Sequence, residues 1–286
     1  MNTPPNLVEK LVALSRKHAR DPYTYIDWPE ELDPDAWYTS PELSSLWGTE
    51  AWERMTEAQR KRLAFLESVN FFSLNIHGEK ALMEGLAARL YASQDARVTA
   101  YLHHFLDEEN KHSVIFGEFC MRYAGKLYPD RKIALPQRGD ALERDLLFFA
   151  KVLVFEELAD AHNQAMALDE RLHGVARVIN AHHHYEEARH LAFGRHVVRD
   201  LARRSAQHWP DTKRRELSDY MTAYLDATWR EYYQIDVYRD LGLEDPWGTL
   251  EAAWDAEAQR ERRRRMSRKS VQCLQQNGIL LEESRS

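Results

Sequence analysis

The stretch NAHHHYEEARH, from Asn180 to His190, holds four histidines and two glutamates in eleven residues. An α-helix turns by about 100° per residue, so residues three, four and seven apart lie on one face. His183, Glu187 and His190 follow this spacing and form one stripe along a helix. The stripe is a metal-ligand set only if other helices supply matching groups.

Three further side chains of this run lie off the stripe or beside it. His182 and His184 fall off it, so we expect them at the surface or in a second layer, and we expect alanine at either position to change little. Glu186 lies near the same face as Glu187. Helical geometry alone therefore leaves both glutamates as candidate ligands.

A second segment carries a related motif. In LDEENKH, Glu109 and His112 form Glu-x-x-His, as do Glu187 and His190. A dinuclear metal site in a four-helix bundle takes such a motif from each of two helices and one glutamate from each of the other two. The sequence therefore predicts that two more long helices each carry a glutamate at matching depth.

The helix before LDEENKH carries such a glutamate. Glu79 lies 30 residues before Glu109, and a hairpin folded about Ser93 places the two carboxylates at similar heights. Glu84 would lie nearly two turns closer to the loop and is the poorer fit. Glu79 is therefore the predicted ligand of this helix.

The helix before the histidine run offers two adjacent glutamates in an apolar context, LLFFAKVLVFEELA. Glu156 and Glu157 lie 31 and 30 residues before Glu187. Neighbouring residues point about 100° apart, so only one of them can face the bundle interior. The geometry of a helix bundle does not decide between Glu156 and Glu157.

Other sites for these residues fit less well. A mononuclear iron site needs two histidines and one carboxylate, and would leave the remaining glutamates buried without a partner. The zinc-protease motif His-Glu-x-x-His is absent. A polar bundle core without metal is the remaining alternative. Because four carboxylates balance two divalent ions, the dinuclear site is favoured.

On these residues the chain resembles the ferritin-like di-iron N-oxygenases, whose type member is p-aminobenzoate N-oxygenase (AurF-type). The family pattern is a lone Glu, Glu-x-x-His, a lone Glu and His-x-x-x-Glu-x-x-His, and the resemblance extends over roughly residues 40–240. The family spacing selects Glu156 over Glu157. The resemblance implies these metal ligands: Glu79, Glu109, His112, Glu156, His183, Glu187 and His190.

The third histidine is the feature specific to this family. Ferritins, ribonucleotide reductase small subunits and bacterial hydroxylases resemble one another in using four carboxylates and two histidines. His183 would add a neutral nitrogen ligand without changing the charge balance. The alternative is that His183 only hydrogen-bonds the cluster.

The resemblance implies a non-haem di-iron oxygenase with two iron ions as cofactor and O2 as co-substrate. Its substrate would be a small amine, aromatic in the family, oxidised at nitrogen towards hydroxylamine, nitroso or nitro. An external electron donor is expected, because the chain has no Gly-x-Gly-x-x-Gly fingerprint for a flavin or nicotinamide. A di-iron C–H hydroxylase or oxidase, and a ferritin-like iron-binding protein, are the alternatives on this scaffold.

No catalytic residue beyond the metal ligands is expected, but some side chains should hold the imidazoles through their second nitrogen. Glu108 and Glu186 immediately precede ligand glutamates and are candidates, each crossing to the opposite histidine. Asp160, one turn from Glu156, is another. The alternative for all three is an ordinary solvated helix residue.

Apolar residues near the ligands decide whether a substrate has room. A cavity among them would favour an enzyme with an organic substrate, and a solid core would count against it. As single residues they are more often core than pocket wall. They are Phe72, Ile76, Met83, Phe105, Phe116, Phe149 and Val152.

The chain of 286 residues is expected to be all-α, a long ferritin-like four-helix bundle with extra terminal helices, because no segment alternates with period two. We expect one domain over residues 1–286: a proline- and aromatic-rich arm (1–54), the metal-binding bundle (55–206) and C-terminal helices (207–286). Helices are expected over about 56–92, 95–125, 140–168, 174–204 and 209–233. A sixth should run from 244 to about 278 with a weak break before Ser267.

Composition limits the partners and the compartment. The net charge of −7 favours neither nucleic acid nor an anionic membrane as a partner. The sequence contains no run of about 18 apolar residues, so no membrane span is expected. The N-terminus does not resemble an export signal, and two cysteines suit free thiols in the cytoplasm. The arginine run 262–265 is interpreted as a solvated helix end, and we expect a homodimer.

Overall fold

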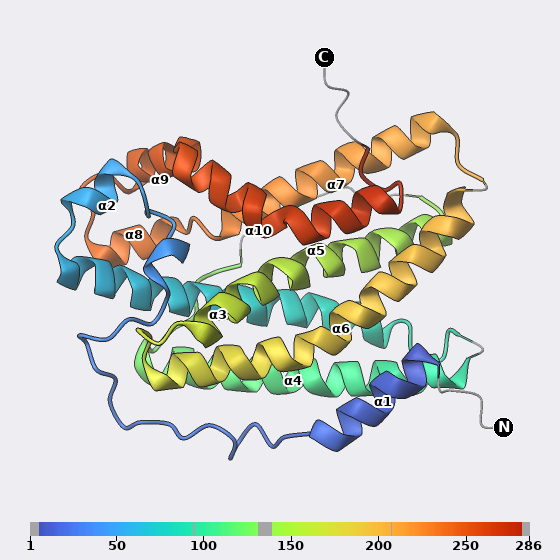
Figure 1. The fold of residues 1–286 in the computed structure, drawn as a ribbon, viewed down its shortest axis with the longest axis horizontal. Helices are drawn as coiled ribbons and strands as arrows, with labels where there is room; N and C mark the ends of the chain where they lie inside the picture. The colour runs from blue at the N-terminus through green and yellow to red at the C-terminus, as the bar shows by residue number, and fades with distance from the viewer. Residues whose placement is uncertain (1–5, 94, 131–138, 207, 282–286) are drawn as a thin grey trace.

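Four long helices form the centre of the protein (Figure 1). The computed structural model describes residues 6–93, 95–130, 139–206 and 208–281. The bundle consists of α3 (Glu57–Ala87), α4 (Ala96–Tyr123), α5 (Ala141–Leu168) and α6 (Gly174–Ala206). No strand occurs among the described residues. The predicted all-α, ferritin-like bundle is therefore confirmed.

Local capping explains where these helices begin. The Thr56 side chain accepts from the Gln59 backbone N–H and the Gln59 side chain reaches back to Thr56, which is a capping box. Asp95 and Asp140 accept hydrogen bonds from backbone N–H groups in the first turns of α4 and α5. All three starts agree with the sequence prediction. The helix α3 ends at Ala87, about one turn before the end expected from the sequence.

Additional helices cover two flanks of the bundle. Figure 1 shows α7 and α10 running along the flank beside α5, while α1 lies across α4 and α6 on the opposite flank. The shorter α2, α8 and α9 gather near the start of α3. Their bounds are α1 Leu7–His18, α2 Glu50–Arg54, α7 Asp211–Glu231, α8 Ile235–Leu241, α9 Pro246–Asp255 and α10 Glu257–Gln276.

The terminal regions differ from the sequence prediction in three places. The N-terminal arm contains the helix α1, because no proline occurs between residues 6 and 21. The C-terminal helix breaks at Ala256, which is extended, and not before Ser267. The short helix α8 was not expected. Residues 131–138, which lie between the helices predicted over 95–125 and 140–168, are outside the described residues.

The arm packs through its aromatic residues, as expected. The Trp37 carbonyl accepts from the His173 backbone N–H at 2.8 Å, and the Tyr38 ring stacks on His173 with centroids 5.3 Å apart. The Trp37 and Trp52 rings also stack. These contacts attach the arm to the turn that connects α5 and α6.

The arginine run on α10 is only partly solvated, so its interpretation as a solvated helix end is wrong for Arg262. This side chain is 3% exposed and donates to the Leu43 carbonyl. Its guanidinium also lies 5.8 Å from the ring centroid of Trp229. Arg264, in contrast, is exposed and pairs with Glu257. Neighbouring side chains of a helix point about 100° apart, so arginines that are adjacent in sequence can differ in burial.

We expect Arg262→Met to lower the free energy of unfolding by about 2 kcal/mol, because it removes a charged donor from a buried carbonyl. The matched variant Arg264→Met should change it by less than about 0.5 kcal/mol, since exposed ion pairs contribute little. Urea denaturation of both variants measures the difference. Equal effects would mean that the buried contact contributes nothing.

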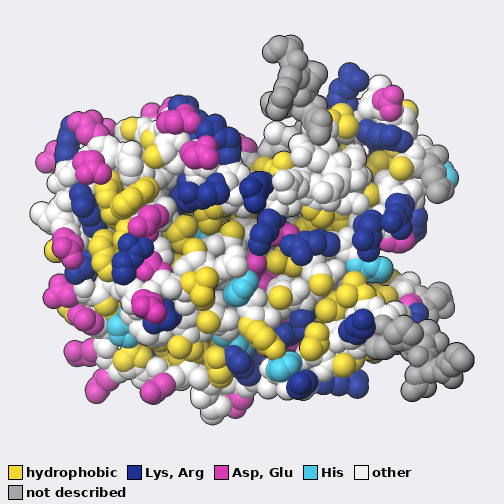
Figure 2. Space-filling model, in the orientation of Figure 1, with side chains coloured by type: hydrophobic (Ala, Val, Ile, Leu, Met, Phe, Trp, Pro, Cys, Tyr) yellow, Lys and Arg dark blue, Asp and Glu magenta, His cyan; other side chains and the backbone are white. Residues whose placement is uncertain are grey.

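The surface is mixed in charge on the face shown in Figure 2. Acidic side chains gather at its left end, while lysine and arginine are interspersed with hydrophobic side chains elsewhere. A continuous basic stripe would be typical of a nucleic-acid-binding protein. Within the described residues, no helix is both long and apolar enough to cross a membrane.

Candidate metal centre

The seven predicted ligands face one another in the interior of the four-helix bundle, each at most 1% exposed. His190 Nδ1 lies 2.8 Å from Glu109 Oε1 and 3.0 Å from Glu187 Oε1. His183 Nε2 lies 3.1 Å from Glu187 Oε1. Three groups with ligand atoms within 4.8 Å of one another complete the cluster: Glu79, His112 and His183; Glu109, His112 and Glu187; Glu156, His183 and Glu187.

The cluster has the donor set and the unpaired atoms that two cations require. Several of its buried polar atoms make no hydrogen bond within the described part of the chain: both carboxylate oxygens of Glu109 and Glu156, one of Glu79 and of Glu187, His112 Nδ1 and His183 Nε2. Unpaired buried polar atoms are costly unless an ion satisfies them. Carboxylates and imidazoles are the ligands of non-haem iron and manganese. The residues present therefore fit a dinuclear metal centre.

The electrostatics of the metal-free cluster lead to the same conclusion. Burial, followed by repulsion from Glu109, raises the pKa of Glu79. Burial and repulsion from Glu187 raise the pKa of Glu156. Carboxylates concentrated in this way repel one another until cations neutralise them.

Two crossing hydrogen bonds hold His112 and His190. The Nε2 atom of His112 lies 3.0 Å from Glu186 Oε2 on α6, and that of His190 lies 2.8 Å from Glu108 Oε2 on α4. In both rings Nδ1 is left to face the cluster. The residue preceding each ligand glutamate thus fixes the histidine of the opposite helix, as the sequence prediction proposed.

Arg189, which was not predicted from the sequence, connects Glu108 and Glu186, the two carboxylates that hold the histidines. Its Nη2 lies 2.7 Å from Glu108 Oε1 and 3.3 Å from Glu186 Oε1, and the side chain is 5% exposed. Burial opposes ionisation of Glu108, but the hydrogen bond from His190 and the charge of Arg189 lower its pKa to about 2. Both holding carboxylates can therefore stay ionised in the interior.

We expect Arg189→Met to weaken metal binding about 10- to 100-fold, the range typical for partners that orient metal ligands. Without the guanidinium, Glu108 and Glu186 lose the cation between them and both histidines lose their fixed orientation. Equilibrium dialysis against a chelator measures the affinity. Arg195→Met is the control, because Arg195 pairs with Glu157 outside the cluster. Equal losses in both variants would contradict this role of Arg189.

His183 is held by a residue that no spacing argument had indicated. Its Nδ1 lies 2.6 Å from the side-chain amide of Asn163, which is fully buried. Its Nε2 faces Glu187 and Glu79. Asn163 lies two turns after Glu156 on α5, and that periodicity could have suggested it.

The neighbouring acidic residues separate clearly from the cluster. Glu157 is buried but pairs with Arg195, so Glu156 is the glutamate of α5 that faces inward. Asp160 contacts His184 at 2.5 Å and not a predicted ligand, so its expected holding role is wrong. Glu84 is exposed on α3.

His182 is not a surface residue. It is 3% exposed, its ring lies 4.8 Å from that of Tyr25, and its Nδ1 lies 3.3 Å from Arg20 Nη1. Its Nε2 lies 3.5 Å from Glu186 Oε2, behind the bond to His112. Alanine at this position therefore should not be silent, whereas His184 keeps that expectation because 37% of its side chain is exposed.

The apolar residues near the ligands form core rather than pocket. Phe105 stacks on the His190 ring at 3.9 Å between centroids, and Phe116 packs edge-on against His183 at 4.9 Å. None of the seven apolar residues named from the sequence lines the two larger cavities of the described structure. The described structure thus has no cavity among these seven residues, and this counts against an organic substrate bound between them.

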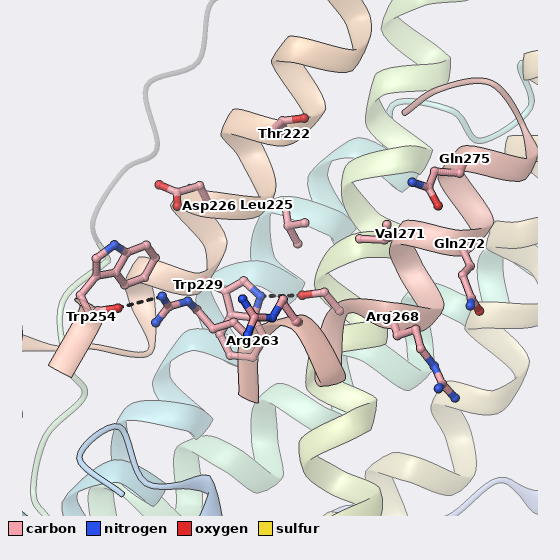
Figure 3. A pocket seen from close by; sticks show the side chains of 12 residues that line it. Thr222, Leu225, Asp226, Trp229, Trp254, Arg263, Arg268, Val271, Gln272 and Gln275 are labelled. Atoms are coloured by element: carbon pink, nitrogen blue, oxygen red, sulfur yellow. Dashed lines mark hydrogen bonds between the residues drawn. The ribbon is translucent and has the colours of Figure 1, made fainter. Parts of the chain in front are cut away.

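The largest of these cavities, about 520 Å³, contains none of the predicted ligands in its lining (Figure 3). It lies between α7, α9 and α10, with Trp229 and Trp254 among its walls. No residue of α3 to α6 lines it. A second cavity of about 370 Å³ lies between α3, α5 and α7, and two of its lining residues, Gly78 and Phe155, immediately precede predicted ligands.

Fold and site together define a ferritin-like non-haem di-iron oxygenase or oxidase. The sequence pattern of the p-aminobenzoate N-oxygenase AurF family matches residues 2–278. The chain belongs to this family.

The chain is also similar to other proteins in sequence and to solved structures in fold. The uncharacterized proteins MT0908 of Mycobacterium tuberculosis and Mb0909 of Mycobacterium bovis are 27% and 26% identical over 277 residues, which cover 86% of this chain and 77% of each relative. Two solved structures of R2-like ligand-binding oxidase variants, both with a Mn/Fe cofactor, superpose with TM-scores of 0.59 and 0.58. They are 16% and 14% identical, over 96% and 97% of this chain and 93% and 94% of theirs.

Proposed function

We propose that this protein uses O2 to oxidise the nitrogen of an aromatic amine, at a di-iron centre held by the seven residues of the cluster. The observation that carries the proposal is the third imidazole: His183 Nε2 faces the carboxylates of Glu187 and Glu79, and Asn163 holds the opposite ring nitrogen. Membership of the AurF family supports the same reaction.

The reaction balances with an external reductant. An arylamine, O2, two electrons and two protons give the arylhydroxylamine and water; further rounds give the nitroso and nitro compounds. When bound, the two irons supply the oxidising chemistry that transfers oxygen to nitrogen. The chain has no nucleotide fingerprint for a flavin or nicotinamide, so the electrons come from a separate donor.

The side chains around the metals position ligands and exclude water. Glu108, Glu186 and Arg189 fix His112 and His190, as their distances of 2.7 to 3.3 Å allow. The rings of Phe105 and Phe116 cover the imidazole faces, which keeps the interior apolar. No further acid or base is assigned.

A panel of amines tests the proposal. The chemically reduced, iron-loaded protein is exposed to O2 with anilines, aminophenols and alkylamines, and products are identified by mass spectrometry. We expect a mass gain of one oxygen on the nitrogen of aromatic amines, with the oxygen derived from ¹⁸O2. Hydroxylation at carbon alone would mean that the protein is a C–H hydroxylase.

An oxidase without N-oxygenation is the second candidate. The fold likeness to R2-like ligand-binding oxidases, which hold a Mn/Fe cofactor, favours it. Metal analysis after expression with iron, with manganese and with both distinguishes a di-iron from a mixed centre. O2 consumption without an oxygenated amine would support the oxidase.

We further propose a homodimer that works in the cytoplasm. The cytoplasmic assignment is supported by Cys120 and Cys273, which form no disulfide among the described residues. Light scattering of the purified protein measures the oligomeric state, and fractionation of the producing cells tests the compartment.

A further inference from the structure

The cavity of about 370 Å³ between α3, α5 and α7 has the size and lining of a small-molecule site. Tyr224 of α7 and Tyr232, which immediately follows that helix, form aromatic walls, and Thr228 of α7 also lines the cavity. His77 of α3 contributes a polar group, and its Nε2 lies 2.9 Å from the Tyr128 carbonyl. Such a mixture of aromatic and polar surface suits an aromatic ring with one polar substituent.

The other side of the metal centre is closed. There Glu108, Arg189 and Glu186 form a buried ionic layer behind His112 and His190. The helix α1 packs over α4 and α6 on that side. Charged side chains and a helix therefore cover this side, whereas α3 and α5, on the opposite side, each contribute a single glutamate.

The cavity lies on the side of α3 and α5. Two of its lining residues, Gly78 and Phe155, immediately precede the predicted ligands Glu79 and Glu156. Burial is the main reason for the raised pKa of Tyr224 and of Tyr232, and the Glu156 carboxylate contributes to the rise in both. The cavity and the cluster are thus close enough to interact electrostatically.

The Phe155 ring lines the cavity, and the next residue of α5 is the predicted ligand Glu156. The ring lies directly against the backbone of α3 at Gly78, where an added Cβ would come within 2.1 Å of the ring carbon Cζ. Only glycine permits this contact, so the ring fills the gap between α3 and α5. An aromatic side chain can leave such a position by rotation about its side-chain bonds.

The same contact recurs seven residues away in each helix. At Gly85 an added Cβ would come within 2.0 Å of the Phe148 ring. Phe148 lines none of the three described cavities and precedes no predicted ligand. The described structure thus contains two glycine–phenylalanine contacts between α3 and α5, of which only that of Phe155 borders the cavity; the Phe148 ring also lies 4.0 Å from the Arg89 guanidinium.

We propose that the cavity receives the aromatic amine and that Phe155, seated on Gly78, is the gate that limits the size of the substrate reaching the metals. This inference rests on the proposed function. Phe155 is a specificity-determining residue and takes no part in the chemistry. The wild-type enzyme accordingly prefers monocyclic over bicyclic arylamines.

Two pairs of variants test the gate. Phe155→Ala removes the ring, and Gly78→Ala displaces it while favouring the helix. Phe148→Ala and Gly85→Ala make the same changes at the equivalent contact. We expect the first pair to raise the kcat/KM ratio of 2-aminonaphthalene to aniline about tenfold or more, within the range of pocket-size effects. The second pair should leave the ratio unchanged, and all four should keep their metal content.

A change of equal size in the kcat/KM ratio in both pairs of variants, or no change in either pair, would overturn the proposal. Because Phe155→Ala can also loosen the bundle, Gly78→Ala provides the second test, and the metal content of each variant verifies the fold.

Binding to the metal-free protein separates this inference from the proposed function. Crystals soaked with 4-bromoaniline should show anomalous bromine density between Tyr224 and Tyr232. Density there without oxidation of any amine would support the cavity assignment and refute the proposed function. Oxidation with no density there, and with unchanged selectivity in the Phe155→Ala variant, would refute the cavity assignment alone.

Discussion

Replacing Glu187 with alanine is expected to reduce the iron content from about two ions per chain to one or none. Glu187 is the most connected residue of the cluster: its Oε1 lies within 3.0, 3.1 and 3.6 Å of nitrogen atoms of His190, His183 and His112. Without it, one carboxylate charge and the contact shared by three imidazoles are lost. Iron is measured by atomic emission on protein loaded and desalted without oxygen.

Glu109→Ala should have a similar effect, since neither of its oxygens has a hydrogen-bond partner in the described structure. Glu84→Ala is the matched control, because Glu84 lies on a bundle helix but is exposed. It should retain full iron content. If Glu187→Ala and Glu109→Ala both kept two irons per chain, the ligand assignment would be wrong.

His183→Ala is expected to slow amine oxidation about 10- to 100-fold while two irons still bind. The four carboxylates that balance the metal charge remain, as do His112 and His190, so the centre can assemble. The neutral third imidazole is lost, and with it the restraint through Asn163. A loss in this range is typical when the environment of a metal changes but its charge balance does not. Product formation under single-turnover conditions and iron content are measured together.

His184→Ala serves as the control, because His184 pairs with Asp160 outside the cluster. It should retain nearly full activity. His182→Ala should fall between the two, since His182 lies behind Glu186. Wild-type oxidation rates in His183→Ala would remove the main support for N-oxygenation and leave an ordinary di-iron oxidase.

The sequence alone determined the bundle and the residues of the cluster. The spacing of three and four between Glu109 and His112, and among His183, Glu187 and His190, places side chains on one helical face whatever the tertiary packing. Hairpin symmetry added Glu79, because the depth of a residue in an antiparallel pair follows from its distance to the loop. The choice of Glu156 over Glu157 needed the family resemblance. The structure then shows Glu157 turned towards Arg195.

The tertiary structure decided everything that depends on contacts between distant segments. Arg189 lies beside a ligand in sequence, yet its role depends on Glu108, which is 81 residues away and on another helix. His182 is buried because Tyr25 and Arg20 of the N-terminal arm cover it. Periodicity assigns a residue to a face of its own helix, but only packing determines what covers that face. The role proposed for Phe155 likewise depends on two tertiary contacts, because its ring lies on Gly78 of another helix and lines a cavity between α3, α5 and α7.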